Sequence, residues 1–224
     1  EKKNRYERGI EGMLQANEDK AVEFYKVAVE NGSIDALNRL AWKYFNGLGV
    51  TADPKEAYRL WEIGAEQQDS YSLYQLGVMC EHGSEEGGIE RDEAKASEFY
   101  RRASEAGDVD ALLNLAMLYT SVGEQEREGR PEGSGVVTKD EQEANKLFRM
   151  AADRGSDEAM FHLGYSYEFG IGVQQSEREA IRWYKRAVEK NHPGAAFNLG
   201  VRYITIFSLS LSLSRDPLLV QWFQ

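Results

Sequence analysis

One pattern of apolar and small residues recurs five times along the chain. Each copy begins at an alanine, has a large apolar residue and then an aromatic residue three and four positions later, and returns to a small residue three positions after the ring. The starting alanines are Ala21, Ala57, Ala96, Ala144 and Ala180, and the aromatic residues are Tyr25, Trp61, Tyr100, Phe148 and Tyr184. Spacings of three and four residues place such side chains on one face of an α-helix.

A second pattern follows each of these helices. In it, a small residue is followed four positions later by a leucine, and another small residue comes directly after the leucine. The leucines are Leu40, Leu76, Leu115, Leu163 and Leu199. The whole frame repeats after 36, 39, 48 and 36 residues. A period in this range predicts a stack of helical hairpins.

Polar residues that suit helix starts stand before both patterns. Those before the first are Asn17, Asp53, Asp92, Asp140 and Ser176; those before the second are Ser33, Asp69, Asp108 and Ser156, with His192-Pro193 at the fifth site. Such side chains accept hydrogen bonds from the first amides of a helix. Glutamates three residues later predict capping boxes at Glu56, Glu143 and Glu179. Glycines between the helices (Gly32, Gly107 and Gly155) suit a left-handed helix end, and Gln68 and Asn191 take their place in two repeats.

These patterns together predict an all-α fold, an α-solenoid. The small residues let two helices approach, and each aromatic ring, which removes roughly 150–250 Å² from water, fills the space above them. A single hairpin cannot bury both of its faces, so neighbours have to stack. We expect about four complete helix-turn-helix repeats and two partial ones, the complete pairs covering 33–68, 69–107, 108–155 and 156–191.

The ends of the array and one loop depart from the frame. We expect a solenoid over 1–203 that starts midway through a repeat, with 17–31 as the second helix of a broken pair and a charged, glycine-rich loop inserted at 122–134. The stretch 204–224 (ITIFSLSLSLSRDPLLVQWFQ) loses the pattern. Its Ser-Leu alternation is typical of a translated CT-dinucleotide tract, so it is either a gene-model artefact or a hydrophobic cap on the last helix.

A known family shares these residues. The run at 156–173 (SDEAMFHLGYSYEFGIGV), with 179–194 after it, resembles the Sel-one-like repeat, a relative of the tetratricopeptide repeat. The resemblance covers about 6–203. It implies a right-handed superhelix of stacked hairpins and a role in holding other proteins together.

Composition narrows the classes of partner. The net charge is −11, from 27 basic and 38 acidic residues, which argues against binding the phosphates of nucleic acids. No run of 18 or more apolar residues occurs, so we expect no membrane span in this chain. The one cysteine, Cys80, excludes an internal disulfide.

Catalytic and metal-binding patterns are not evident. The three histidines, His82, His162 and His192, lie in helix-end or variable repeat positions, and none has a ligand partner at the HxxxH or CxxC spacing. Gly47-Leu48-Gly49 and Gly170-Ile171-Gly172 follow helices, so they are repeat turns rather than phosphate loops. We therefore expect no catalytic residues, no cofactor and no metal.

The surface that binds partners should lie on the first helix of each pair. Two positions directly after the second small residue vary from repeat to repeat. They hold Trp42 and Lys43, Val78 and Met79, Met117 and Leu118, Tyr165 and Ser166, and Val201 and Arg202. Part of this set packs within the stack and part faces the groove, where Trp42, Met79, Met117 and Tyr165 would form an apolar strip suited to binding hot spots. Packing alone is an equally good explanation of the set.

Three functions follow. A non-enzymatic scaffold or adaptor for unidentified proteins, in an unknown oligomeric state, fits the repeats best. The resemblance also admits a substrate-receptor subunit of an ER-associated degradation ubiquitin ligase, supported by a sequon at Asn31, and regulators of chitin synthase or of bacterial signalling. The third, an enzyme like the cysteine-rich bacterial relatives described as β-lactamases, is disfavoured because those relatives carry paired cysteines in each repeat and this chain has one cysteine. The sequence leaves the compartment unknown, between the cytoplasm and, if targeting signals lie outside this sequence, the ER lumen.

Overall fold

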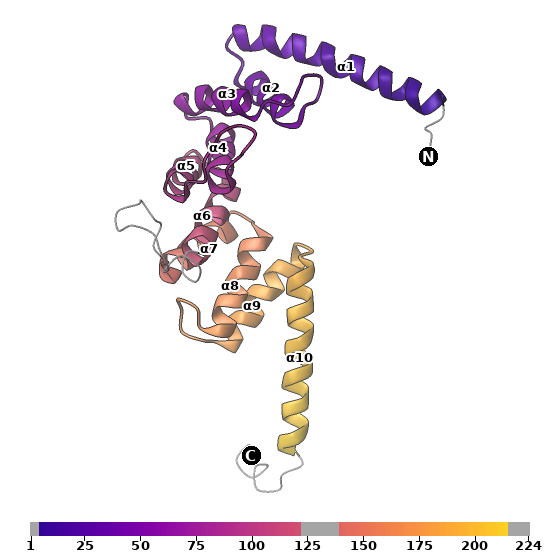
Figure 1. The fold of residues 1–224 in the computed structure, drawn as a ribbon. Helices are drawn as coiled ribbons and strands as arrows, with labels where there is room; N and C mark the ends of the chain where they lie inside the picture. The colour runs from indigo at the N-terminus through magenta and orange to yellow at the C-terminus, as the bar shows by residue number, and fades with distance from the viewer. Residues whose placement is uncertain (1–4, 122–138, 215–224) are drawn as a thin grey trace. The chain divides into compact units, whose positions relative to one another are not determined.

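The computed structural model describes residues 5–121 and 139–214, with side chains from 17 to 120 and from 139 to 205. Ten helices make up the ordered structure of these ranges (Figure 1). The only strand-like pairing in them is an isolated antiparallel bridge between Ser84 and Ile89. The expected loop insertion at 122–134 and the end of the tail at 215–224 lie outside the described residues. The described part is an all-α repeat fold, as the sequence predicts.

The chain divides into two compact units. The first contains α1 (Arg5–Glu30), α2 (Ile34–Asn46), α3 (Pro54–Glu66), α4 (Ser70–His82), α5 (Glu93–Glu105) and α6 (Val109–Ser121) as far as Leu118. In this unit α2 packs on α3 and α4 packs on α5, the pairs that the sequence predicts, while α1 packs on α2 and α3 on α4.

The second unit continues from Tyr119. It contains α7 (Glu141–Asp153), α8 (Asp157–Phe169), α9 (Glu177–Glu189) and α10 (Pro193–Ser214). Here α8 packs on α9, and α9 packs on α10. The same hairpin therefore builds both units.

The predicted helix starts are confirmed at every described position except Asn17, which lies inside α1. Asp53, Asp92 and Ser176 accept hydrogen bonds from the amides three residues later in α3, α5 and α9, and Asp140 does so in α7. The second helices start in the same way at Ser33, Asp69, Asp108, Ser156 and His192, whose acceptor is the ring Nδ1. Gly32, Gly107 and Gly155 have left-handed φ angles, as do their replacements Gln68 and Asn191.

The capping boxes are only half formed. The glutamates expected to reach back to the cap instead pair with a basic residue one turn ahead: Glu56 with Arg59, Glu143 with Lys146 and Glu179 with Arg182. Pairs of this spacing stabilise a helix by about 0.2–0.5 kcal/mol. The sequence therefore gives the cap residue correctly but the wrong partner for the glutamate.

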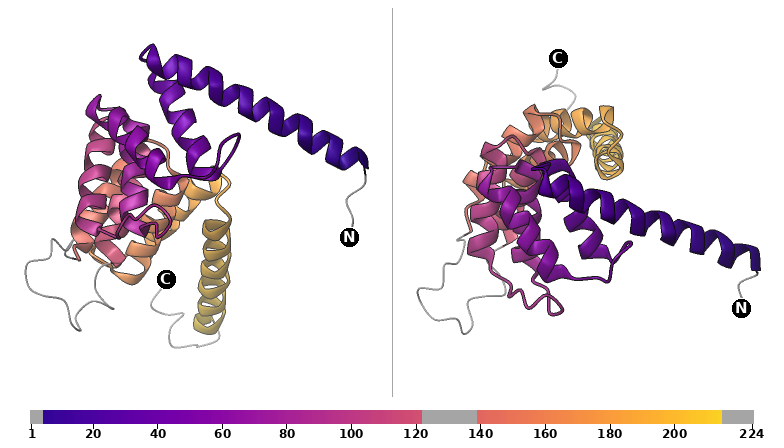
Figure 2. Two further views of the ribbon diagram at one scale, coloured as in Figure 1. Left: turned by 45° about the horizontal axis from the view of Figure 1, so that its top comes forward. Right: turned by 90° about the horizontal axis from the view of Figure 1, so that it is seen from above.

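The predicted break before 17–31 is wrong. α1 runs without interruption from Arg5 to Glu30, and both views of Figure 2 show it as one helix that extends past α2. Met13, Leu14, Gln15 and Ala16 are strong helix formers, and a cap worth about 1 kcal/mol at Asn17 is too little to stop them. At the other end, α10 continues to Ser214, where the frame called for a loop after Tyr203.

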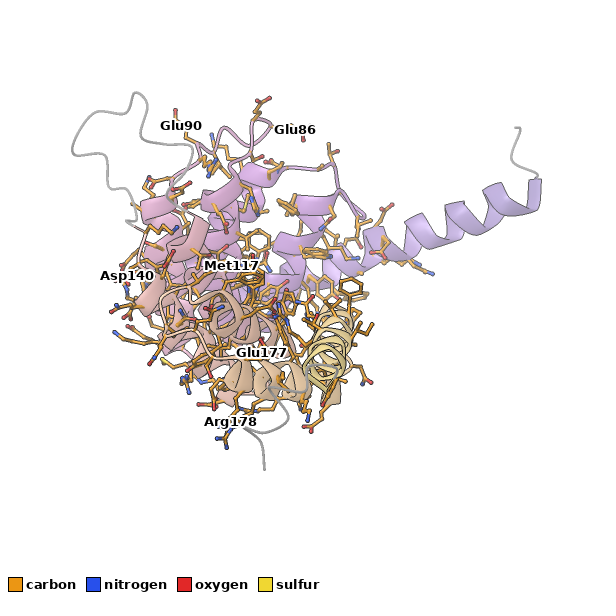
Figure 3. All side chains as sticks on the ribbon, turned by 90° about the horizontal axis from the view of Figure 1, so that it is seen from below. Glu86, Glu90, Met117, Asp140, Glu177 and Arg178 are labelled. Carbon is orange, nitrogen blue, oxygen red and sulfur yellow. The ribbon has the colours of Figure 1, made fainter. Side chains whose placement is uncertain are left out.

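The Gly-x-Gly turns dock one helix pair on the preceding one. Gly47 and Gly170 end α2 and α8 in the left-handed conformation. The second glycine of each turn lies against a carbonyl of the preceding helix, because a Cβ at Gly49 would be 2.5 Å from the Glu18 oxygen and one at Gly172 2.4 Å from the Glu141 oxygen. The longer turn between α4 and α5 closes through the Ser84–Ile89 bridge, and Glu86 and Glu90 point away from it (Figure 3).

The cores of the two units contain the recurring rings and leucines. Trp61, Tyr100, Phe148 and Tyr184 are buried, as are Leu40, Leu76, Leu115 and Leu163. Tyr25 on α1 and Leu199 on α10 are half-buried. Among the described helices, none is long and apolar enough to cross a bilayer.

Candidate protein-binding groove

The first unit contains an open groove of about 860 Å³ beside α2. Five of its lining residues come from α2, namely Asp35, Asn38, Arg39, Trp42 and Lys43. Their spacings of one, three and four residues place them on one face of the helix. Tyr25 on α1, Asp69 at the N-cap of α4 and Tyr71 on its first turn complete the lining. We call this set of eight residues the α2 groove.

Trp42 is the aromatic centre of the α2 groove. The residue is 44% exposed, and its ring stacks on Phe45 with ring centroids 6.2 Å apart and an interplanar angle of 27°. Phe45 in turn lies 6.0 Å from the buried ring of Trp61. The exposed indole therefore stacks on one ring, Phe45, which in turn contacts a ring of the core.

A polar network fixes the floor of the groove. The Asn38 amide donates to the Asp69 carboxylate at 2.8 Å, and the Ser72 hydroxyl donates to the Asn38 oxygen at 2.7 Å. Asp69 also caps α4 by accepting from the Ser72 amide at 2.8 Å. These hydrogen bonds link the start of α4 to α2 through the side chains of Asn38, Asp69 and Ser72.

Charges of both signs surround Trp42. Lys43 pairs with Glu18 of α1, whereas Arg39 is exposed and forms none of the ion pairs present in the described part of the chain. Burial raises the pKa of Tyr71, and the positive charge of Arg39 partly offsets this rise. Asp35 and Asp69 balance Arg39 and Lys43 in formal charge. Because Lys43 is already paired with Glu18, Arg39 is the cation of the α2 groove that an incoming anion can use without breaking that pair.

The predicted surface pairs divide in a regular way. The first member of each pair is exposed or half-buried, namely Trp42, Val78, Met117, Tyr165 and Val201. The second members Met79, Leu118 and Ser166 are buried, and Lys43 is half-buried. One residue turns a helix by about 100°, which carries the second member from the open face toward a neighbouring helix. Burial removes Met79, Leu118 and Ser166 from the set that a partner can touch, and the prediction is corrected for these three.

The groove also contains residues that the sequence did not single out. Asp35, Asn38 and Arg39 occupy the first turns of α2, and Tyr71 the first turn of α4. The signal was available, because Arg39 and Trp42 are three residues apart and share a face in any helical reading. Tyr25 was assigned to the core, and the structure places it on the groove wall.

Outside the α2 groove, the cysteine and two histidines that could take part in chemistry pack against neighbouring side chains. Cys80 is buried, and burial raises the pKa of its thiol, which disfavours the reactive thiolate. His192 contacts Glu158 at 2.9 Å, and His162 stacks on Phe148 with centroids 4.8 Å apart. No group of three or more metal-ligating side chains occurs within the described ranges.

Comparison with known proteins identifies the repeat. The Sel1 repeat family matches five segments, at residues 4–33, 34–69, 70–108, 132–156 and 157–192. The segments 34–69, 70–108 and 157–192 agree within one residue with predicted pairs, and 132–156 matches the last part of the pair predicted at 108–155. Together the five segments cover most of the chain. The chain therefore belongs to the Sel1 repeat family.

Solved structures share the fold. A protective antigen of uropathogenic Escherichia coli, c5321, is 31% identical with a TM-score of 0.71, over 81% of this chain and 36% of that one. A Sel1 repeat protein from Oxalobacter formigenes is 30% identical with a TM-score of 0.70, over 83% of this chain and 69% of that one.

A curated relative carries a functional name. Chitin synthase regulatory factor 2 of Schizosaccharomyces pombe is 32% identical over 114 residues, which are 48% of this chain. The match spans 22% of that relative's length.

Proposed function

We propose that the chain is a non-enzymatic adaptor and that the α2 groove binds a segment of a partner protein. Sel1 repeat proteins are generally protein-interaction scaffolds. The observation that carries the proposal is Trp42, a half-exposed indole stacked on Phe45 at the centre of the groove. Tryptophan is among the residues most enriched in binding hot spots.

The groove chemistry defines the partner segment. Trp42 offers a flat apolar surface for a large apolar side chain, and Arg39, one turn earlier on the same helix face, offers a guanidinium for a carboxylate. The fixed bonds among Asn38, Asp69 and Ser72 leave little to reorganise when a segment binds. We therefore expect a short segment in which a large apolar residue stands beside an acidic residue.

Selection from a random peptide library on the full chain tests this proposal. Selected peptides should carry the apolar–acidic pair, and Trp42→Ala should weaken them by about 2 kcal/mol, or roughly 30-fold. Phe24→Ala is the matched control, because Phe24 is an exposed ring on α1 outside the groove lining. Arg39→Gln should weaken an acidic peptide but leave its amide analogue unchanged. Peptides that bind Trp42→Ala as well as the original chain would refute the groove as the site.

The relatives favour a second and finer candidate. The similarity to a chitin synthase regulatory factor suggests regulation of a chitin synthase as the adaptor's task. Expression of the chain in fission yeast lacking that factor should restore normal chitin deposition, and failure with a stably expressed chain would count against it. The role in ER-associated degradation has no support in the relatives named above and stays a prediction.

A further inference from the structure

Two glycines in the array hold a tyrosine ring directly against a helix backbone. A Cβ at Gly77 on α4 would lie 2.6 Å from the Tyr100 ring, and one at Gly164 on α8 would lie 2.5 Å from the Tyr184 ring. A carbon atom cannot approach a ring this closely. Glycine is therefore what permits these rings to lie so deep.

Each seated ring also meets an aromatic wall. Three residues before the glycine, Tyr74 lies 5.9 Å from Tyr100 at 42°, and Phe161 lies 5.9 Å from Tyr184 at 41°. The two units thus repeat one tilted ring pair, an arrangement that aromatic rings favour. Where alanine replaces the glycine, at Ala41 and Ala116, the wall position holds Asn38 and Leu113, neither of them aromatic.

A carboxylate receives the phenol at the tip of the ring. Four residues after the glycine, Glu81 accepts from the Tyr100 hydroxyl at 2.7 Å, and Glu168 accepts from the Tyr184 hydroxyl at 2.7 Å. We call this three-part arrangement of wall, glycine floor and tip residue an aromatic seat. In both cases the ring comes from the second helix of the same pair.

α10 carries a third seat. Phe197 and Gly200 stand at the wall and floor positions, and no described atom lies within 4 Å of a Cβ built at Gly200. The wall ring of Phe197 is 72% exposed, and Val201 beside the floor is also exposed. The tip position holds Ile204, which has no acceptor for a phenol.

We propose that the seat of Phe197, Gly200 and Ile204 binds a phenylalanine ring carried by an amphipathic helix of a partner protein. The occupant follows from continuity, because the same floor and wall already receive a helix-borne ring on α4 and on α8. Glu81 and Glu168 give the phenol an acceptor at the tip, whereas the Ile204 side chain offers an apolar contact and no acceptor, which favours phenylalanine over tyrosine. This site is on the second unit and is independent of the α2 groove.

Three synthetic peptides test the ring preference. They copy residues 176–191 and carry phenylalanine, tyrosine or alanine at position 184. Titrated into the ¹⁵N-labelled full chain, the phenylalanine peptide should shift the amides of Phe197 and Gly200 saturably. The tyrosine peptide should bind roughly tenfold more weakly and the alanine peptide should not saturate. Equal affinity of the phenylalanine and tyrosine peptides, or no binding by any of them, would overturn the proposal.

Two variants of α10 locate the binding. Gly200→Leu fills the floor and should abolish the shifts, whereas Thr205→Leu, about 140° away around the helix, should bind as the original chain does. Circular dichroism should show the same helicity for both, because leucine is a good helix former. Binding that survives Gly200→Leu would refute the site. Self-association of the chain that Gly200→Leu abolishes would make a second copy the occupant and would overturn the proposal of a separate partner.

Discussion

Gly164 shows what a single missing methyl group does to the distance between two helices. It lies in the middle of α8, where alanine would favour the helix by about 1 kcal/mol, and yet the ring of Tyr184 occupies the place of a side chain. Close packing of the ring over the backbone is worth more here than helix propensity. The same argument applies to Gly77 under Tyr100.

Gly164→Ala should therefore destabilise the chain by about 1–3 kcal/mol, because the added Cβ forces the Tyr184 ring to move. Gly200→Ala is the matched control, since it occupies the same repeat position in open space and should gain up to about 1 kcal/mol from helix propensity. Urea unfolding followed by circular dichroism measures both. Shifts of the same sign and size would contradict the seat geometry.

The Tyr184 hydroxyl donates a hydrogen bond to a buried carboxylate, that of Glu168. Glu168 is buried, and its carboxylate accepts from Tyr184 and pairs with Arg202, while Asn198 donates to the phenol oxygen at 3.2 Å. Tyr184→Phe leaves the carboxylate without one donor and should cost about 1–3 kcal/mol in unfolding free energy. Tyr100→Phe should cost less, because Glu81 is only half-buried and water can replace the phenol. An equal loss for the two variants would count against this explanation.

At the scale of the helix, the sequence predicts the pairs well because caps and ring positions are local signals. Asp53, Asp92 and Ser176 each start a helix where the pattern places it. The predicted break before Asn17 is wrong because the strong helix formers ahead of Asn17 outweigh its cap signal.

The candidate site was predicted only in part. Trp42 was found because it varies within a fixed frame, whereas Met79 and Leu118 were assigned to the surface although they are buried. The difference is one step of helix rotation, and it depends on which neighbour packs against the helix. The floor of Asn38, Asp69 and Ser72 joins α2 to α4, and a contact over that sequence separation leaves no local pattern.

The Gly-x-Gly turns offer a test at the same scale. Gly172 has a left-handed φ of 63°, and its Cβ would meet the Glu141 carbonyl at 2.4 Å, whereas Gly155 has a φ of 100° with open space around it. Gly155→Ala should cost about 1–2 kcal/mol from backbone strain alone. Gly172→Ala should cost more, because it adds a clash with the start of α7. Thermal unfolding of the two variants measures the difference, and a larger loss for Gly155→Ala would be inconsistent with the docked turn.

For the molecule as a whole, stability should depend on pH through His162. Burial lowers the pKa of this ring, the carboxylate of Glu158 opposes that shift, and the nearby His192 adds to it. The folded chain therefore binds this proton less tightly than the unfolded chain, in which histidine titrates near about 6.5. The contribution is fully present above about pH 6.5 and is lost as the pH falls below that value toward the lowered pKa.

His162→Gln should flatten this pH dependence, because glutamine does not titrate and already occupies the same repeat position at Gln75. The urea concentration at the unfolding midpoint of the original chain should fall as the pH is lowered from about 7.5 to about 5. The midpoint of His162→Gln should fall less over the same pH range. Parallel falls in the two proteins would show that other groups cause the effect.

The most direct test of the adaptor proposal is to find which helices a bound partner segment protects from hydrogen exchange. Hydrogen exchange of the full chain, with and without a selected apolar–acidic peptide, reports protection along every helix. We predict slower exchange in α2 and in the first turn of α4, next to Trp42 and Tyr71, with α7 unchanged. Saturating peptide that leaves α2 unprotected and slows exchange elsewhere would contradict the α2 groove as the binding surface.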